Sequence, residues 1–350
     1  MLMREELEAW ERQQLSPLAT LSAESWGRCR PEESDDLRTC FMRDRDRVIH
    51  SKAFRRLSQK TQVYITPSGD HYRTRLTHTL EVNQIAKTIG KALWLNEDLI
   101  EAIALAHDVG HTPFAHTGEE VLNALMPEGF RHNKNSVRVL EHLERHKGEP
   151  GLNLSREVLD GVLYHSGYAT AQKGAATLEG QIIRFSDKIA YVQHDIDDSI
   201  RAGILQEADL PQQYTEVLGH SHGDRITTLV TDLVCHARSM MEQADSREQL
   251  QLCFTPDIDQ ALRGLRAFLF DNVYRGDICA KERERAALVV RYLFEHYCRY
   301  PEQMPALYQQ IVETEGIEQG VCDYLSGMTD AYCITAFKEI TIPRSFISMG

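Results

Sequence analysis

The sequence predicts an all-α protein. Hydrophobic residues follow a helical spacing over long stretches, as in the stripe formed by Leu76, Leu80, Ile85, Ile89 and Leu93. Strand signals are confined to residues 62–65 and 70–72, which flank a Pro-Ser-Gly turn and are expected to form one short hairpin. At 350 residues the chain can bury an ample core, and this length favours one helical body with a C-terminal lobe.

The helices are expected in the following order. The stripe above predicts a helix over 77–93, and Ile100, Ile103, Ala104 and Ala106 predict a second one up to residue 107. Pro113 suits the first turn of a third helix that runs to about residue 125. Further helices are predicted at 136–147, 155–165, 179–202, 211–219, 224–244, 247–252, 257–274, 280–299, 303–314 and 317–341. Gly, Pro, Asn and Ala mark loops at 128–135, 148–154 and 166–177.

The cysteine pattern and the absence of targeting signals indicate a reducing compartment. The eight cysteines form no CxxC motif and no metal-ligand spacing, so free thiols are expected. The N-terminal segment is acidic and amphipathic rather than a signal peptide, and no apolar run approaches the roughly 18 residues of a membrane span. We therefore expect a cytoplasmic protein. No Walker loop or GxGxxG motif is present, so phosphate binding cannot rest on a glycine-rich loop.

The most informative segment is AHDVGHTPFAHTGEE. It places His107, Asp108, His111, His116 and Glu119 within thirteen residues. Such a cluster is costly to bury unless its members pair with one another or hold a metal, because a buried unpaired charge carries a large desolvation penalty. The segment therefore predicts a functional site.

A metal at this site needs ligands from elsewhere in the chain. A helix that ends near Gly110 presents His107 and Asp108, and the sequence offers His78 and Asp187 as further ligands. Imidazole and carboxylate together suit Mn, Fe, Ni or Zn, and Mg less well. We expect one divalent cation, with Mn favoured.

This H…HD…D arrangement resembles the HD-domain metal-dependent phosphohydrolases. The wider sequence is similar to the bacterial deoxynucleoside triphosphate triphosphohydrolases, the dGTPase-like branch of that superfamily. The similarity is specific over residues 26–200 and weaker beyond, and Met42 and Ala115 depart from the family pattern, which tends to have Gln and Gly there. It is carried by RTCFMRDRDRVIHSKAFRRLSQKTQVY, DHYRTRLTHTLEVNQIAKTI, AIALAHDVGHTPFAHTGEE, FRHNKNSVRVLE, GLNLSREVLDG, FSDKIAYVQHDIDD, FLFDNVYRG and DYLSGMTDAY.

The resemblance implies an HD-domain helical bundle and a reaction. The bundle would cover residues 38–205, after an extension at 1–37, and a helical C-terminal lobe at 206–350 would complete the same body. Water, activated by the metal, would attack the α-phosphorus of a dNTP and release the deoxynucleoside and inorganic triphosphate. His116 and Glu119, neighbours at i and i+3, resemble the family's catalytic couple, with His116 donating a proton to the 5′ oxygen. His111 is grouped with them as a catalytic candidate.

Further residues are expected to bind the substrate. The net charge of −13 argues against a generic polyanion binder, but residues 43–60 hold seven Arg or Lys against two Asp. Arg43 to Arg47 are expected to pair on a solvated face, whereas guanidinium groups further along match phosphate oxygens. The expected phosphate contacts are Arg55, Arg56 and Arg75 from this argument, and Lys188, His132 and Asn133 from the resemblance. Gln62, Tyr191 and Asp195 are implied to hold the deoxyribose, and the role of His194 stays open.

Other functions would share part of this pattern. An HD phosphodiesterase or 5′-nucleotidase would share the four ligands but would not require the RRLSQKTQV segment or the couple of His116 and Glu119. A nucleotide-binding regulatory protein would have a degenerate site, whereas here every ligand is present. The acidic balance argues against nucleic acid as a partner. Family members commonly form homo-oligomers, so we expect one here, with a hexamer and an allosteric nucleotide as open options.

Overall fold

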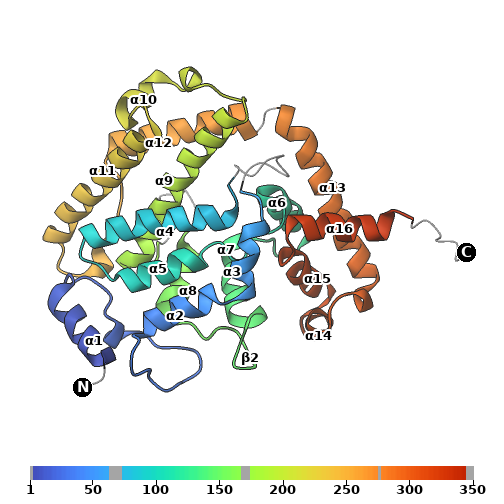
Figure 1. Cartoon of the computed structure of the whole chain (residues 1–350), viewed down its shortest axis with the longest axis horizontal. Helices are drawn as coiled ribbons and strands as arrows, with labels where there is room; N and C mark the ends of the chain where they lie inside the picture. Colours follow the sequence, from blue (N-terminus) through green and yellow to red (C-terminus); the bar gives the residue numbers. More distant parts are fainter. Residues whose placement is uncertain (1–2, 63–72, 167–173, 275–276, 344–350) are drawn as a thin grey trace, which may run out of the picture.

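The computed structural model describes residues 3–62, 73–166, 174–274 and 277–343. These residues contain sixteen α-helices and one sheet of two short antiparallel strands. The all-α prediction is therefore confirmed. In Figure 1, α4, α5 and α9 run through one half of the molecule, and α13 to α16 form a separate group on the right, with α6 facing them. No helix among the described residues is long and apolar enough to cross a membrane.

The described residues form helices in the following order along the chain. The first half contains α1 (Met3–Gln14), α2 (Cys40–Ile49), α3 (Lys52–Arg56), α4 (Arg75–Ala92), α5 (Glu97–Ala106), α6 (Ala115–Leu125), α7 (His132–Arg138) and α8 (Arg156–Tyr164). The second half contains α9 (Leu178–Arg201), α10 (Gln212–Leu218), α11 (His222–Gln243), α12 (Pro256–Leu269), α13 (Asp277–Arg299), α14 (Ala306–Glu315), α15 (Ile317–Ser326) and α16 (Asp330–Thr341). The strands are β1 (Arg145–His146) and β2 (Glu149–Pro150).

Most predicted helices match these bounds to within a few residues, and three predictions are wrong. The single helix expected at 317–341 is two helices, because the chain leaves helical geometry after Ser326 and Thr329 caps α16 by accepting from the Tyr332 N–H. The helix expected at 136–147 begins at His132 and ends in a π-helical turn at Leu143. The segment 247–252 forms only a short 3₁₀ turn, Arg247–Gln249.

A short hairpin was not anticipated. Lys147 and Gly148, both at positive φ, connect β1 to β2, which is the geometry that a tight two-residue hairpin turn requires. The hairpin expected at 62–72 lies outside the described residues except for Gln62. The flanking residues Thr61 and Thr74 do form an isolated antiparallel bridge.

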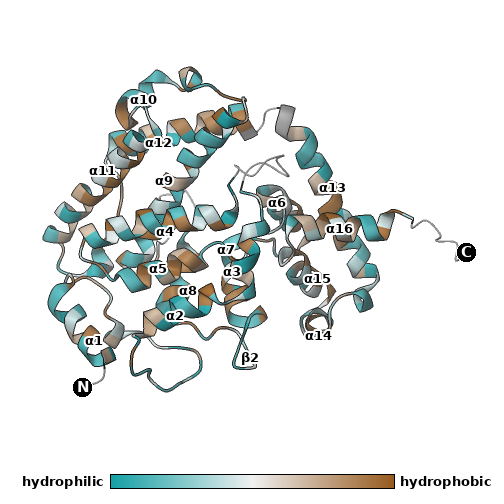
Figure 2. Ribbon diagram, viewed as in Figure 1, coloured by the Kyte–Doolittle hydropathy of each residue, from teal (hydrophilic) through white to brown (hydrophobic). Residues whose placement is uncertain are grey.

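The larger hydrophobic core surrounds α5. Leu99, Ile100 and Ile103 are fully buried, and the helix packs against α2, α4, α8 and α9. In Figure 2, hydrophobic and hydrophilic residues alternate along outer helices such as α11 and α13. At the start of α5 the Asn96 side chain accepts from the N–H groups of Asp98 and Leu99, so the helix begins at a defined residue. The cap and the packing of the core together position α5, and so the residues that follow its last residue, Ala106.

A second hydrophobic core joins α6 to the C-terminal helices. Phe114 and Leu122 pack in one cluster with Leu293 of α13, Val321 of α15 and Cys333 of α16. The helices α13 to α16 thus form a lobe that buries one face of α6, whereas α10 to α12, which the sequence analysis placed in the same C-terminal lobe, pack into the first core. The exact boundaries predicted at 37/38 and 205/206 stay predictions.

Two buried polar groups tie this lobe to the segment that follows α5. The Lys60 ammonium donates to the carbonyl oxygens of His111 and of Ser326, the latter at 2.8 Å. Burial lowers the pKa of Lys60 to about 7, and the neighbouring Arg56 acts in the same direction. A lysine held in this way by two carbonyls connects the end of α15 to the loop after His107.

Asp330 makes the second connection. Its carboxylate accepts from the backbone N–H groups of Thr61 and Phe114, each at 3.0 Å, and contacts the Thr61 hydroxyl. Buried backbone N–H groups need such partners, since an unpaired one costs about 1–3 kcal/mol. One side chain of α16 therefore holds Thr61 and Phe114, which lie before and after the candidate ligands of α4 and the end of α5.

The cysteines agree with the expectation of free thiols. Every cysteine whose side chain the structure describes is free, which covers all but Cys279. Cys322 and Cys333 are buried in the second core, and burial raises the pKa of each thiol.

Candidate metal and catalytic site

His107 and Asp108 follow directly after the last residue of α5. Both are buried, and the His107 Nδ1 lies 2.6 Å from the Ala104 carbonyl oxygen. A carbonyl accepts only, so Nδ1 carries the proton and Nε2 presents a lone pair. That Nε2 is buried and has no hydrogen-bond partner among the described residues. The histidine is therefore oriented as a ligand.

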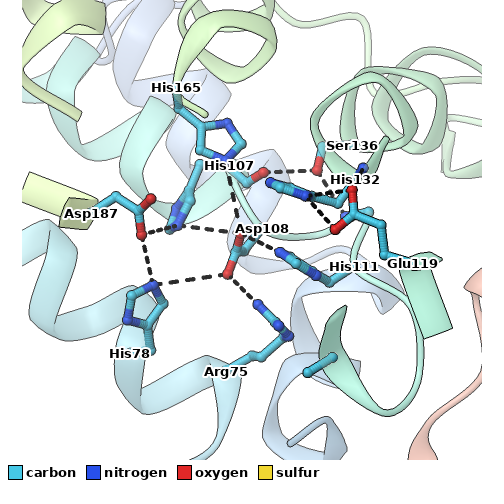
Figure 3. A network of polar contacts seen from close by, with 12 residues as sticks. Arg75, His78, His107, Asp108, His111, Glu119, His132, Ser136, His165 and Asp187 are labelled. Carbon is cyan, nitrogen blue, oxygen red and sulfur yellow. Dashed lines mark hydrogen bonds and ion pairs between the residues drawn. The ribbon is translucent and has the colours of Figure 1, made fainter. Parts of the chain in front are cut away.

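His78 from α4 and Asp187 from α9 face the same point (Figure 3). The His78 Nε2 lies 3.1 Å from Asp187 Oδ1 and 3.9 Å from Asp108 Oδ2. The His107 Nε2 lies 3.5 Å from Asp108 Oδ1 and 4.0 Å from Asp187 Oδ1. Ligand atoms of His78, His107 and Asp108 all lie within 4.8 Å of one another. The structure thus brings the four predicted ligands together.

The chemistry of this set fits a divalent cation. Burial raises the pKa of Asp108, but His111, His107 and Arg75 outweigh it and hold that pKa well below its usual range. Burial also raises the pKa of Asp187, and the hydrogen bond from His78 reverses the effect and keeps that pKa low. Two buried carboxylates and two imidazoles with inward nitrogens form a mixed oxygen and nitrogen donor set. The unpaired His107 Nε2 is the atom that a cation would satisfy.

Arg75, one turn before His78, is tied to the same carboxylate. Its guanidinium donates to Asp108 Oδ2 at 2.8 Å, and its Nε is buried without a hydrogen-bond partner among the described residues. Arg75 therefore both orients Asp108 and leaves one N–H directed at the cavity it lines. This is compatible with the phosphate contact expected from the sequence.

Beside the four candidate ligands lies a second group of histidines. The rings of His111 and His132 stack with their centroids 4.0 Å apart, and His111 Nε2 lies 3.2 Å from Asp108 Oδ1. Glu119 accepts from both the Nδ1 and the backbone N–H of His132, each at 3.0 Å, whereas His116 Nδ1 is 3.6 Å from Glu119 Oε2. The expected neighbours His116 and Glu119 are close, but Glu119 is shared with His132.

This sharing sets different charges on the histidines. Burial lowers the pKa of His132, but the hydrogen bond and charge of Glu119 outweigh it and raise the pKa above its usual value. Burial and the nearby Arg75 lower the pKa of His111. Burial raises the pKa of Glu119, and its histidine partners more than reverse that effect. Within the stacked pair, the environment thus favours the cationic form of His132 and the neutral form of His111.

The position of α7 explains how His132 reaches His111. The Ser136 hydroxyl accepts from the Gly110 N–H and donates to the His107 carbonyl oxygen, and Asn135 donates to the Gly110 carbonyl oxygen. A Cβ on Gly110 would lie 2.1 Å from the Ser136 backbone nitrogen. Only glycine permits this close approach of α7 to the end of α5.

His116 stands on a strained turn. Phe114 and Ala115 both adopt the left-handed region, at φ of 60° and 54°, which is uncommon for residues other than glycine. The hydrogen bond from the Phe114 N–H to Asp330 holds this conformation. His116 is exposed as a result, and its ring centroid lies 6.2 Å from that of Tyr191.

A cavity of about 360 Å³ connects these groups. The sequence-predicted residues that line it are Gln62, Arg75, His78, Asp108, His111, His116, Glu119, His132, Asp187, Lys188 and Tyr191. Burial and then Arg184 lower the pKa of Lys188, to about 8. The cavity thus combines the candidate ligands His78, Asp108 and Asp187 with the histidine group and with cationic side chains.

The other candidates lie outside this cavity. Arg55 and Arg56 line a separate cavity of about 580 Å³, where Arg55 donates to the His50 carbonyl oxygen at 2.8 Å. Asn133 donates to the Leu163 carbonyl oxygen at 2.6 Å. Asp195 is fully buried one turn after Tyr191, and neither carboxylate oxygen has a hydrogen-bond partner within the described ranges. Substrate contacts by these residues stay predictions.

Sequence reasoning missed four residues of the cavity lining: Arg131, His165, Ser166 and Arg266. His165 repeats the arrangement of His107, since it follows the last residue of a helix and its Nδ1 lies 2.6 Å from the Val162 carbonyl oxygen. Its Nε2 lies 4.0 Å from Asp108 Oδ1, and burial together with His107 lowers its pKa to about 4. A histidine at a predicted helix end before a glycine-rich loop was the available signal. Arg266 belongs to α12 and has no local signal.

Known proteins resemble this chain over its whole length. The HD domain model matches residues 75–192, which include all four candidate ligands, and the model of the phosphohydrolase-associated domain matches residues 252–339. The chain is 55% identical to a deoxyguanosinetriphosphate triphosphohydrolase-like protein of Clostridium perfringens (strain 13 / Type A), over 98% of this chain and 99% of that protein. Identity to the protein of the same description from Clostridium tetani (strain Massachusetts / E88) is 53%, over 99% and 98%. For Caldanaerobacter subterraneus subsp. tengcongensis it is 52%, over 100% and 99%.

Replacement of Asp187 tests the metal site. Asp187→Ala is expected to weaken Mn²⁺ affinity by more than the roughly 10–100-fold that the loss of an outer partner of a ligand causes, because a ligand itself is removed. Isothermal titration and elemental analysis of the purified protein measure this. Asp197→Ala is the matched control, since Asp197 lies on α9 but pairs with Arg73 and Arg201. Full metal content and unchanged affinity in Asp187→Ala would exclude Asp187 as a ligand.

Proposed function

This chain belongs to the family of deoxyguanosinetriphosphate triphosphohydrolase-like proteins with an HD domain, and we propose that it hydrolyses a deoxynucleoside triphosphate to the deoxynucleoside and inorganic triphosphate. One observation carries the proposal: His78, Asp108 and Asp187 line one cavity together with the histidine group, and the His107 Nε2 lies within 4.0 Å of both carboxylates. Arg75, Arg131, Lys188 and Arg266 line it as well. They supply local positive charge for a triphosphate in a protein whose net charge is −13.

His78, His107, Asp108 and Asp187 would hold one divalent cation, with Mn²⁺ favoured. When bound, the cation supplies Lewis acidity for a phosphoryl oxygen and activates water. Its place between two carboxylates and two imidazoles leaves the histidine group free for proton transfer.

His116 is proposed as the general acid. Glu119 Oε2 lies 3.6 Å from its Nδ1 and can orient the ring, so that a proton on Nε2 can be donated to the departing 5′ oxygen. The alkoxide leaving group is strongly basic, so its protonation lowers the barrier. His132, whose cationic form Glu119 favours, would contact phosphate oxygens, and His111 would position the α-phosphoryl group beside Asp108.

Gln62 and α9 are proposed to select the sugar. The Gln62 side chain is almost fully buried at the cavity, and its Oε1 has no hydrogen-bond partner among the described residues. It is thus available to the 3′-OH; Asp195, the second residue expected there, is buried one turn after Tyr191 and does not line the cavity. The Tyr191 ring lies next to His116, so a sugar whose 5′ oxygen meets His116 would pack against this ring. We propose that Tyr191 leaves no space for a 2′-hydroxyl.

The reaction products test the proposed function. The purified chain, incubated with Mn²⁺ and each dNTP in turn, is expected to release inorganic triphosphate and the deoxynucleoside, resolved by ion-exchange chromatography. Release of pyrophosphate or orthophosphate, or turnover only of cyclic or monophosphate nucleotides, would contradict the proposal and favour a phosphodiesterase or 5′-nucleotidase. No turnover of any of these would favour a regulatory protein.

The general-acid assignment predicts a kinetic split. His116→Ala is expected to lower kcat by roughly 10²–10⁴-fold, while Mn²⁺ and nucleotide affinities stay close to those of the wild type, because only proton transfer is removed. Single-turnover rates and binding titrations measure the two effects. His142→Ala is the control, since His142 is exposed and does not line the cavity. Normal turnover in His116→Ala would move the acid role to His111 or to water.

The steric role of Tyr191 predicts relaxed selectivity. Tyr191→Ala is expected to lower the ratio of dGTP to GTP hydrolysis by roughly 10–100-fold, because space opens for the 2′-hydroxyl. The comparison of kcat/KM for the two nucleotides measures it, with Tyr292→Ala, on the outer surface of α13, as control. If the variant hydrolyses dGTP well and GTP as poorly as the wild type, Tyr191 is not the wall.

A further inference from the structure

His78 differs from the other buried histidines of the site in how its second nitrogen is paired. His107 and His165 follow the ends of their helices, where carbonyl groups are free, and each Nδ1 meets the carbonyl oxygen three residues earlier. His78 lies inside α4, where the backbone carbonyls are occupied by the helix itself. Its Nδ1 therefore needs a side-chain partner to fix the ring.

That partner is His194 of α9. The Nδ1 atoms of the two rings lie 3.2 Å apart, and the rings meet edge to face with a centroid separation of 5.2 Å. On its other side, His194 Nε2 contacts Glu81 Oε2, from the turn of α4 that follows His78. Both histidines are buried, whereas the Glu81 side chain is 40% exposed.

The position of each proton in the series His78, His194 and Glu81 follows from the role of the His78 Nε2. Without a cation, the His78 Nε2 lies 3.1 Å from Asp187 Oδ1 and donates to it. With a cation bound, His78 Nε2 must offer its lone pair, so the proton is on Nδ1. His194 Nδ1 must then accept that proton's hydrogen bond, which places the His194 proton on Nε2. The Nε2 atom contacts the Glu81 carboxylate, which can only accept.

We propose that Glu81 and His194 form a relay that positions His78 as a metal ligand and fixes its tautomer. This inference rests on the proposed metal site. Histidine ligands usually donate their second N–H directly to a carboxylate or a carbonyl, which orients the ring and raises its basicity. Here a second imidazole stands between the ligand and the carboxylate. Glu81 and His194 touch neither substrate nor metal, so they are positioning residues.

The outer end of the relay is anchored by Arg73. Its guanidinium lies 3.3 Å from Glu81 Oε1 and also pairs with Asp197 and Asp198 of α9, at 2.8 and 2.7 Å. The arginine thus connects α4 to α9 beside the relay and restrains the Glu81 carboxylate. The restraint matters because Glu81 is the one member of the relay that water reaches.

Metal affinity and the protonation of His78 test the proposal on the full-length chain without nucleotide. His194→Ala is expected to weaken Mn²⁺ binding by roughly 10–100-fold, as for other outer partners of ligands. His194→Asn can still accept from His78 through its amide oxygen and is expected to recover most of that loss. Glu81→Ala should weaken binding more than Glu81→Gln, which keeps an acceptor for His194. Gln84→Ala, on the exposed side of α4, is the matched control.

The tautomer gives a readout that simple loss of packing would not produce. In ¹⁵N-labelled protein loaded with diamagnetic Zn²⁺, long-range ¹H–¹⁵N spectra are expected to show His78 protonated on Nδ1, with an N–H that exchanges slowly with water. In His194→Ala this N–H should exchange faster, and in His194→Asn the slow exchange should return. If His194→Ala does not fold, His194→Asn and the two Glu81 variants give the same comparison.

The outcomes separate this inference from the proposed function. If the wild type binds Mn²⁺ and the relay variants bind it equally well with His78 unchanged, the relay is wrong and the metal site stands. Equal losses in His194→Asn and His194→Ala would also overturn it, since packing rather than hydrogen bonding would then be responsible. If the wild type binds no divalent cation, the proposed function fails first.

Discussion

The burial of the Asp108 carboxylate is the constraint on which the rest of the site depends. Arg75 and His111 contact it directly, and His78, His107 and His165 lie within 4.0 Å, so five side chains from three segments converge on one group. A buried carboxylate without such partners would be strongly destabilising. The cation expected beside it would complete the compensation, because Arg75 is the only one of these partners with a permanent positive charge.

The site lies where the two hydrophobic cores meet. The first core, around α5, positions α4 and α9 and therefore the four candidate ligands. The second core buries Phe114 and one face of α6, and so positions His116 and Glu119. Lys60 and Asp330 cross between the cores through backbone hydrogen bonds. The C-terminal helices are therefore part of the support for proton transfer, although most of their residues lie far from the cavity.

Local sequence signals predicted the elements well where a helix has a clear apolar stripe and failed where a short-range signal opposes it. Thr329 is a good helix cap, but the apolar pattern continues across it. The pattern therefore predicts one helix where the structure has α15 and α16. His165 has the same helix-end geometry as His107 but lacks a neighbouring aspartate. Isolated histidines at helix ends therefore carry more information than their local sequence suggests.

The sequence alone determined the all-α class, the HD pair with His78 and Asp187, and the cluster that contains His116 and Glu119. These follow from residue type and spacing, which are properties of one segment at a time. Only the tertiary structure decided that Glu119 is shared with His132, that Arg266 reaches the cavity, and that His194 backs His78. The reason is physical: these contacts join helices that are distant in sequence, and the packing of the two cores sets which faces of those helices meet.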